Sequence, residues 1–295
     1  MFDGVLECMA NEWSMCDDCE HTQYNGGIGR VTPTYLLCPS APFNPTLHNS
    51  SATKLEALSK GNYAASYGSW KYAQAIENGP KGDGWQAQGV GNDITNPTDA
   101  PKWNRAIGIM SIAVFTRRGQ EAGTNENRDE DRGTWKIGSR QGASVRKVRD
   151  GVSKTIIVSE LLNDAKPDDV RGVWTSGAVG AAAFTGYNPP NAKTGQRYTT
   201  FLWVDGQPGI ELEDIQGGDF LTGCTRRPSD QSLLCSGSGS QNGNEWAAAR
   251  SKHAGGVVVA MADAGTRFIT DEVELHTWQA MLSRAGNESI SGDEL

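Results

Sequence analysis

The chain has 295 residues and a formal net charge of −8 at pH 7, and hydrophobic residues make up 37% of it. This apolar content is sufficient for a folded core and excludes wholesale disorder, and the acidic surplus argues against a nucleic-acid partner, which requires excess lysine and arginine. The 36 glycines among 295 residues are about 12% of the chain, against a usual share of ~7%. This excess favours many turns in a loop-rich β architecture. No apolar run reaches the ~20 residues that a membrane-spanning helix needs, so no membrane span is expected in this chain.

The first part of the chain is predicted to be rich in loops. Residues 1–34 show little periodicity and are expected to form a loop-rich N-terminal segment, followed by one globular domain at 35–295. Ser51–Gly61 starts with a serine, has leucines on one face and ends in glycine, so it is predicted to be a short helix. The glycine, asparagine and aromatic residues of 61–100 predict long surface loops.

Short strands are predicted in the middle of the chain. Ile107–Phe115 is an apolar run interrupted by glycine and β-branched residues, which favours a strand over a helix. The polar and charged segment Gln120–Gly133 is expected to be an exposed excursion. Further apolar runs predict strands at Thr155–Ser159, Arg171–Thr175 and Thr199–Val204.

The C-terminal part carries the clearest signals. An apolar run at Gly256–Ala262, a tight turn at 263–265 and a second run at Thr266–Thr270 predict a β-hairpin. Asp271 and Glu274 are spaced as a capping box, so a final helix is predicted to start there and to end at a glycine.

Six cysteines lie at positions 8, 16, 19, 38, 224 and 235. The Cys16-Asp-Asp-Cys19 pair, with Cys8, His21 and Cys38 nearby in the sequence, is compatible with zinc or redox chemistry. Zinc ribbons, however, normally use two such pairs, and the intervening carboxylates would raise the thiol pKa values. Structural disulfides and free thiols are the other interpretations. Cys224 and Cys235 enclose ten residues, a loop of suitable size for a disulfide.

His253 and Asp263 resemble a catalytic pair, but their spacing excludes direct contact within one strand. Ten steps of extended chain at ~3.3 Å each place them roughly 33 Å apart, whereas a general base and its orienting carboxylate must lie within about 3 Å. We expect these residues to mark opposite ends of one strand, with a local hydrogen bond at His253 and an Asx-type turn at Asp263.

Catalytic sequence motifs are absent. The sequence lacks a Gly-x-Ser-x-Gly elbow, a phosphate-binding loop, a His-Glu-x-x-His motif and a dinucleotide fingerprint. We therefore predict a protein that is not an enzyme and needs no cofactor, with calcium as the one exception. The alternative is a secreted carbohydrate-binding or hydrolytic module whose loop aromatics stack on sugar rings. The candidate aromatics are Trp70, Tyr72, Trp85 and Trp103.

A candidate calcium site lies in the polar segment. Asn127, Asp129 and Asp131 place side-chain oxygens at every second position, the spacing with which a loop can wrap around a hard cation. Arg128 and Arg132 oppose a cation there, so a solvated loop without an ion is the competing interpretation.

Three segments together resemble one protein family. Asp150-Gly151 followed by an apolar run to Glu160 is similar to its central segment, and His253 followed by Asp263-Ala-Gly265 is similar to its C-terminal signature of histidine, nine residues and Asp-Gly. The Leu-Cys-Pro-Ser stretch around Cys38 is similar to a third family segment. The chain thus resembles a large prepilin-like family of unknown function that is expanded in planctomycete bacteria.

The resemblance implies a fold and a role. It implies an α+β fold, a mainly antiparallel pilin-like head with short helices and glycine-rich loops, in an extracellular or cell-surface protein without established enzymatic activity. It further implies a homo-oligomer or the subunit of a surface filament or secretion-type pseudopilus. The prepilin leader and the long apolar helix of such proteins are not found at Met1. Three interpretations are open: a start codon assigned too late, a separate head fragment, or assembly through other contacts. Without the helix, association is expected to depend on head-to-head or β-edge contacts.

Overall fold

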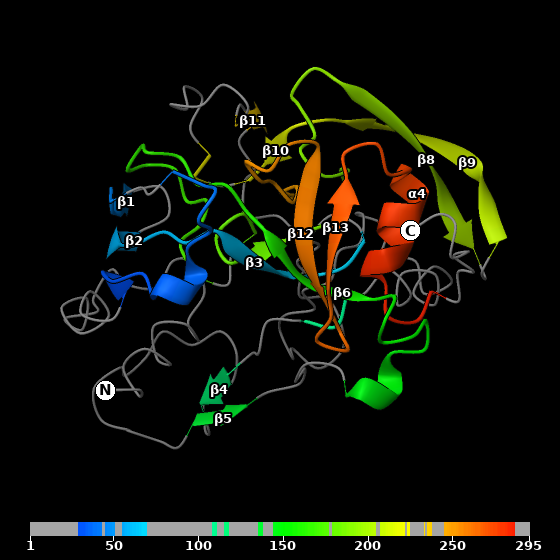
Figure 1. Ribbon diagram of the computed structural model, residues 1–295, viewed down its shortest axis with the longest axis horizontal. Helices are drawn as coiled ribbons and strands as arrows, with labels where there is room; N and C mark the ends of the chain where they lie inside the picture. The colour runs from blue at the N-terminus through cyan, green and yellow to red at the C-terminus, as the bar shows by residue number, and fades with distance from the viewer. Residues whose placement is uncertain are drawn as a thin grey trace.

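A computed structural model describes most of the second half of the chain and parts of the first half (Figure 1). The described residues are 29–42, 45–50, 55–69, 108–110, 115–117, 135–137, 144–176, 179–204, 207–221, 223–224, 233, 235–237 and 245–286. Within these ranges, no helix has the length and apolar character required to cross a membrane.

A five-stranded sheet with the order β13-β12-β6-β3-β7 forms the centre of the described structure. Its strands are β3 (Tyr63–Ser66), β6 (Ile156–Glu160), β7 (Ala183–Phe184), β12 (Gly256–Met261) and β13 (Thr266–Thr270). Neighbouring strands are antiparallel except β3 and β7, which are parallel. Three of the four neighbouring pairs join strands that are distant in sequence, so the sheet gathers remote segments at its centre.

Four two-stranded pairs surround this sheet. They are β1 (His48–Ser50) with β2 (Leu55–Leu58), β4 (Phe115–Arg117) with β5 (Trp135–Ile137), β8 (Arg197–Val204) with β9 (Gln207–Gln216), and β10 (Asp219–Phe220) with β11 (Cys235–Gly237). All are antiparallel except β10 with β11. Two single-turn 3-10 helices, η1 (Thr34–Leu36) and η3 (Val145–Lys147), complete the described elements together with one α-helix, α4 (Leu275–Leu282).

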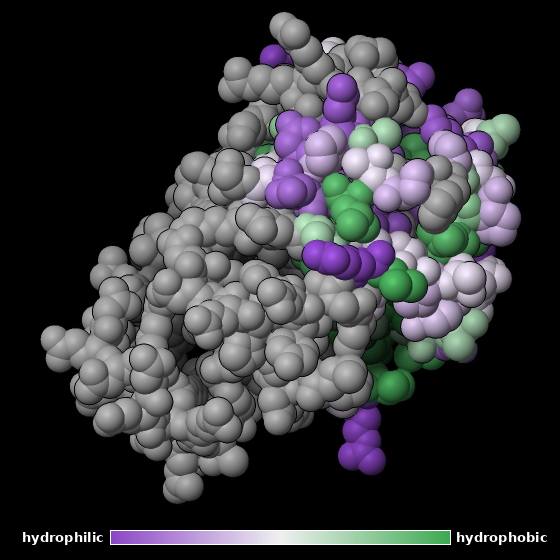
Figure 2. Space-filling view, turned by 90° about the vertical axis from the view of Figure 1, so that its left-hand side faces the viewer, coloured by the Kyte–Doolittle hydropathy of each residue, from purple (hydrophilic) through white to green (hydrophobic). Residues whose placement is uncertain are grey.

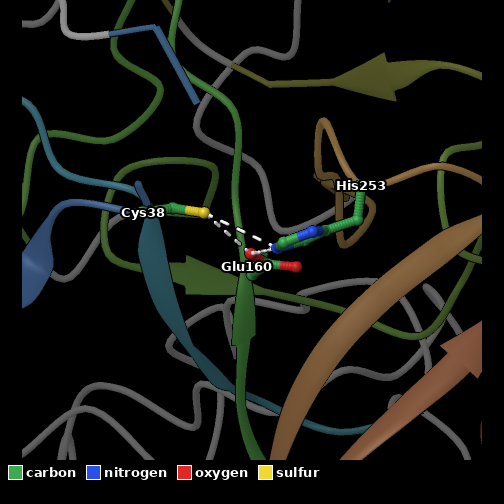
Figure 3. A group of neighbouring side chains, drawn as sticks. All are labelled: Cys38, Glu160 and His253. Atoms are coloured by element: carbon green, nitrogen blue, oxygen red, sulfur yellow. Dashed lines mark hydrogen bonds and ion pairs between the residues drawn. The ribbon is translucent and has the colours of Figure 1, made fainter. Parts of the chain in front are cut away.

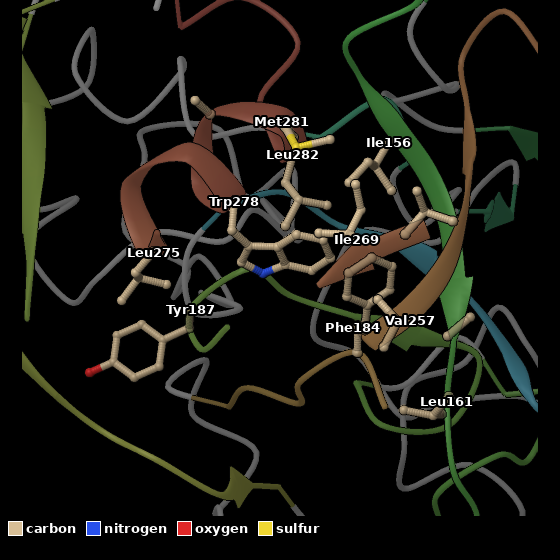
Figure 4. Packing of buried hydrophobic residues seen from close by; sticks show 14 of the residues in the cluster. Ile156, Leu161, Phe184, Tyr187, Val257, Ile269, Leu275, Trp278, Met281 and Leu282 are labelled. Atoms are coloured by element: carbon tan, nitrogen blue, oxygen red, sulfur yellow. The ribbon is translucent and has the colours of Figure 1, made fainter. Parts of the chain in front are cut away.

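Helix α4 packs its apolar side chains into the main core (Figure 4). Trp278 is fully buried, its ring centroid lies 6.2 Å from that of Phe184, and its indole N–H donates to the Asn188 carbonyl at 3.0 Å. Burial of a large aromatic side chain contributes strongly to stability, provided that its polar atom keeps a partner. α4 is therefore held by tertiary packing, with Ile269 of β13 in the same cluster.

A buried ionic network fixes the segments beside the sheet. Arg171 forms a bidentate pair with Asp169, through Nε to Oδ1 at 3.0 Å and Nη2 to Oδ2 at 2.8 Å, and donates to Asp219 Oδ2 at 2.9 Å. Arg250 donates to Asp219 Oδ1 at 2.8 Å, and the Ala248 N–H donates to the same oxygen at 3.0 Å. The four charged side chains are 0–2% exposed, and two acids balance two bases.

The charges of this network hold its carboxylates ionised. Burial alone would raise the pKa of Asp219, but Arg250 and Arg171 keep it below its ordinary value. The pKa of Asp169 is lowered in the same way by Arg171, against the effect of burial. A native carboxylate pKa below the unfolded value contributes stability that is lost as the pH falls through the native pKa.

The α+β class predicted from the sequence is confirmed, as are the strands of the C-terminal hairpin. Several other element predictions are wrong. The surface loops predicted for 61–100 include Tyr63–Ser66, which is β3 and lies between β6 and β7 in the central sheet. Residues 108–110 of the strand predicted at Ile107–Phe115 do not form a strand. Ser51–Gly61 is not a helix, because Leu55–Leu58 forms β2 and pairs with β1. Arg171–Thr175 is not a strand, since it runs through turns with one isolated bridge, from Val173 to Lys60.

The predicted capping box of the last helix is also absent. α4 begins at Leu275 with Glu274 as its N-cap, and no side chain caps it. The Asp271 carboxylate instead accepts a hydrogen bond of 2.6 Å from the Asn191 side chain. A tertiary contact has therefore replaced the local cap. The predicted boundary between residues 34 and 35 stays a prediction.

Replacing Asp219 with Asn is expected to destabilise the protein. The substitution removes the charge that faces both Arg171 and Arg250, and breaking a buried ion pair costs about 3–5 kcal/mol. Urea unfolding followed by circular dichroism measures this loss. Asp263→Asn is the control, because that exposed side chain can keep its turn contact as an amide. Equal unfolding free energies for the two variants would contradict the stabilising contribution of the buried ion pairs.

Neutral burial of His48 is expected to contribute to acid unfolding. Its side chain is fully buried, its Nδ1 lies 2.9 Å from the Asp169 carbonyl oxygen, and burial lowers its pKa from 6.5 to about 4. Between these pH values the unfolded chain binds a proton that the native protein does not, so stability falls with decreasing pH by up to about 1.4 kcal/mol per pH unit.

His48→Asn tests this dependence, because an amide can still donate to the Asp169 carbonyl but does not titrate. The wild type should lose more unfolding free energy than the variant between pH 6.5 and 4. Urea titrations across this range provide the comparison, and parallel pH profiles of the two proteins would show that His48 does not carry the effect.

Candidate functional site

Three chemically reactive side chains from distant segments meet at one end of β6 (Figure 3). Cys38 follows η1, Glu160 is the last residue of β6, and His253 lies three residues before β12. The sequence separations are 122 residues from Cys38 to Glu160 and 215 residues from Cys38 to His253. Only the folded sheet brings these groups together.

The polar atoms of these side chains converge on Glu160 Oε1. The Cys38 thiol donates to this oxygen at 3.1 Å, and His253 Nε2 lies 3.0 Å from it. The Cys38 Sγ and His253 Nε2 atoms are 3.7 Å apart. Sulfur, oxygen and nitrogen thus form a compact triangle.

Glu160 is fixed by hydrogen bonds from backbone N–H groups of β12 and of the segment before it. The Val258 N–H of β12 donates to Glu160 Oε2 at 2.7 Å, and the Arg250 N–H donates to the Glu160 carbonyl at 2.9 Å. The carboxylate therefore continues the β6–β12 ladder beyond its last backbone pair. Because Oε2 is engaged in this way, Oε1 is the oxygen presented to Cys38 and His253.

Cys38 is held in place by Asn62. The buried Asn62 side chain accepts a hydrogen bond of 3.1 Å from the Cys38 N–H, and the Asn62 N–H donates to the Leu36 carbonyl at 2.8 Å. Cys38 is 5% exposed. Burial, and then the hydrogen bond to Glu160, raise the pKa of the thiol above its ordinary value. Burial and the hydrogen bond to Glu160 thus favour the protonated thiol.

His253 forms the solvent side of the site. Its backbone N–H donates to Ser251 Oγ at 3.0 Å, and that hydroxyl donates to the Gly256 carbonyl at 2.6 Å. Its side chain is 32% exposed, whereas that of Glu160 is 2% exposed. Access from solvent to the cluster is therefore expected along the imidazole.

The geometry differs from that of a cysteine nucleophile activated by a histidine and a carboxylate. In such triads the carboxylate orients the imidazole from the nitrogen opposite the nucleophile. Here the same Nε2 faces both Cys38 Sγ and Glu160 Oε1. The cluster is instead suited to hold a cation or to link three chain segments by hydrogen bonds.

His253 and Asp263 lie at opposite ends of the β12 strand, and the structure does not bring them together. Asp263 Oδ1 accepts a hydrogen bond of 2.8 Å from the Gly265 N–H, which is an Asx-type turn. Ala264 adopts a positive φ of 67° in this turn. The residue with left-handed backbone in the hairpin is therefore an alanine and not the glycine that follows it.

Asp150 and Gly151 connect a turn to the end of α4. Asp150 Oδ2 accepts hydrogen bonds from Ser283 Oγ at 2.9 Å and from the Gly286 N–H at 2.8 Å. Gly151 has a φ of 102°, a conformation that favours glycine. Both residues therefore have structural roles, and the contacts of Asp150 are to the segment after α4 and not to Cys38, Glu160 or His253.

Of the remaining candidate site residues, two form a disulfide and the others lie outside the described residues. Cys224 and Cys235 form a disulfide, so their sulfur atoms are not available as ligands although Asp169 lies beside them. The proposed calcium ligands Asn127, Asp129 and Asp131 lie outside the described residues. The same holds for the aromatic residues of the carbohydrate-binding alternative and for Cys16 and Cys19.

The proximity of Cys38, Glu160 and His253 was not predicted from the sequence. Each residue stands in one of the three segments that carry the family resemblance, but His253 was considered together with Asp263, ten residues along the chain. These segments contribute one thiol, one carboxylate and one imidazole to the cluster. Nothing local in the chain indicated that they share one site.

The comparisons with known proteins identify the family. A model described as a protein of unknown function, DUF1559, matches residues 9–276. The match covers most of the chain, and the chain belongs to this family. No curated protein and no solved structure matches the chain.

Replacing Ala264 with Gly is expected to stabilise the hairpin. Glycine adopts a positive φ without the steric cost of a Cβ, and the gain exceeds the added entropy of the unfolded chain, for a net effect of about 0.5–1 kcal/mol. Thermal unfolding measures the change. Ala260→Gly, within β12, is the matched control and should destabilise by about 0.5–1 kcal/mol. A lower melting temperature for Ala264→Gly would contradict the expected strain.

Proposed function

We propose that the protein is a non-catalytic, pilin-like structural protein of the cell surface or extracellular space. In this proposal its head domain contacts further copies of itself and contributes to a surface filament or a secretion-type pseudopilus. The α+β head with an antiparallel sheet agrees with such a role. The Cys224–Cys235 disulfide supports an oxidising, extracellular environment, in which such bonds form and persist.

The observation that carries this proposal is the free edge of the central sheet. β13 is the terminal strand in the strand order and pairs only with β12 among the described strands. An edge strand presents unpaired backbone groups that can pair with another chain. A second copy of this chain is the partner that self-assembly requires.

The register shows which groups of β13 are available. The Met261 N–H donates to the Gly265 carbonyl, and the Asp271 N–H donates to the Gly255 carbonyl. Because hydrogen-bonded and non-hydrogen-bonded pairs alternate in an antiparallel ladder, the Val258–Phe268 pair is of the non-hydrogen-bonded kind. The backbone N–H and carbonyl of Phe268 therefore point away from β12, toward the free edge.

The side chains of this strand agree with an accessible edge. Phe268 is 47% exposed, whereas its neighbour Ile269 is 5% exposed and faces the core. On the face shown in Figure 2, apolar side chains among the described residues emerge in small groups between polar ones. The exposed side chain of Phe268 can therefore add a contact to pairing of the strand edge.

Self-association should weaken when the outward amide of Phe268 is removed. Phe268→Pro deletes an N–H at the free edge without deleting a β12–β13 hydrogen bond, so assembly should weaken by at least about tenfold while the hairpin persists. Sedimentation velocity over a concentration series measures the association, and circular dichroism checks the fold.

Phe268→Thr is the matched control, because it keeps the amide and removes only the aromatic ring. It should associate more strongly than the proline variant. A wild-type protein that remains monomeric at high concentration would overturn the proposal, and equal assembly of the wild type and Phe268→Pro would exclude this edge as the contact.

A further inference from the structure

We propose that Cys38, Glu160 and His253 form a binding site for a divalent transition-metal ion, with Zn²⁺ as the best-matched ion. This inference concerns a ligand of the head domain and is independent of the self-association proposed above. It is based on the positions, the chemistry and the supporting contacts of the three side chains.

The separations between the three donor atoms are close to those of a tetrahedral zinc site. Zn–S bonds of about 2.3 Å and Zn–N or Zn–O bonds of about 2.0–2.1 Å give donor-to-donor distances of roughly 3.3–3.6 Å. The structure has 3.7 Å between sulfur and nitrogen, 3.1 Å between sulfur and oxygen, and 3.0 Å between nitrogen and oxygen. Small side-chain rotations that shift these atoms by a few tenths of an ångström bring the observed separations to those of a zinc site.

The donor types select the kind of ion. Thiolate and imidazole ligands favour Zn²⁺ and related borderline ions, whereas calcium and magnesium take oxygen ligands. A thiolate and a carboxylate together carry two negative charges, which balance a divalent cation in a largely buried position. On binding, the sulfur–hydrogen bond is replaced by a sulfur–metal bond, and the proton leaves to solvent without any redox change.

The surroundings orient these side chains as ligands. Val258 holds Glu160 Oε2, which leaves Oε1 directed at the cluster. Asn62 fixes the backbone of Cys38, and Ser251 fixes the backbone of His253. Supporting contacts of this type position the ligands of metal sites. The 32% exposure of the His253 side chain leaves a path for the ion and for a water molecule as fourth ligand.

A metal ion at this point would link three remote parts of the chain. The segment after η1 would be tied to the end of β6 and to the segment before β12 by direct metal bonds. Because these segments come together only in the folded state, ion binding is coupled to folding and should raise the melting temperature as the concentration of free Zn²⁺ increases.

Cobalt substitution provides a direct test. The full-length protein is stripped of metal with a chelator in the absence of oxygen and without added reductant, which keeps the Cys224–Cys235 disulfide intact. It is then titrated with Co²⁺, and afterwards with Zn²⁺ in competition. A thiolate-to-cobalt charge-transfer band in the near ultraviolet, saturating at a single ion per chain and removed by Zn²⁺, is the expected result. Cys38→Ser should abolish this band, and His253→Ala should weaken Co²⁺ binding by at least about tenfold.

Two controls separate this site from others. His276→Ala removes a histidine of similar exposure, 34%, that pairs with the exposed Glu274, and should leave the cobalt band unchanged. The double variant Cys16→Ser/Cys19→Ser removes the other candidate thiol pair of the sequence and should also retain the band. If Cys38→Ser does not fold, the test rests on the Co²⁺ affinity of His253→Ala, which replaces a side chain that is 32% exposed.

The proposal is overturned if no charge-transfer band forms in the wild type. It is equally overturned if the band persists in folded Cys38→Ser, or if it is lost in Cys16→Ser/Cys19→Ser alone. The oligomeric state, measured separately by sedimentation, distinguishes the failure of this inference from the failure of the proposed self-assembly.

Discussion

The buried pairing of Asp219 with two arginines is the constraint on which the described structure depends. Arg171 comes from the segment after β6, Asp219 from β10, and Arg250 from the segment before β12, and all are 0–2% exposed. Buried charges are costly to desolvate, so each must find its partner for the chain to fold. Through these contacts the network ties the three segments to one another.

The same network places the candidate site. Arg250 binds Asp219 through its guanidinium and donates its backbone N–H to the Glu160 carbonyl at 2.9 Å. His253 follows three residues later and lies 3.0 Å from Glu160 Oε1. An arginine that balances a buried acid thus also positions the short segment that carries the imidazole, and the geometry of the cluster follows from the electrostatics of the core.

The sequence allowed the prediction of elements that depend on neighbouring residues. The hairpin of β12 and β13 was predicted because its apolar runs and its turn are adjacent in the chain. The Ser51–Gly61 helix was wrong, because pairing with β1 overrides a local helical pattern. The Cys38–Glu160–His253 cluster could not be predicted, since partners 122 and 215 residues apart leave no local signal in a single sequence. The disulfide loop, in contrast, closes over a short segment and was a candidate from its spacing.

The strand order β13-β12-β6-β3-β7 has a consequence for the kinetics of folding. Among the neighbouring pairs of this sheet, only β12 and β13 are consecutive in the chain. Each of the other three pairs closes a long loop, including the parallel pair of β3 and β7. High contact order of this kind slows folding to a timescale on the order of milliseconds to seconds. The central strand β6 also gains its β12 neighbour only when the C-terminal part of the chain has been synthesised. The sheet is therefore complete only once the segment carrying β12 and β13 has been synthesised, and this hairpin is its one pair of neighbouring strands joined by a short turn.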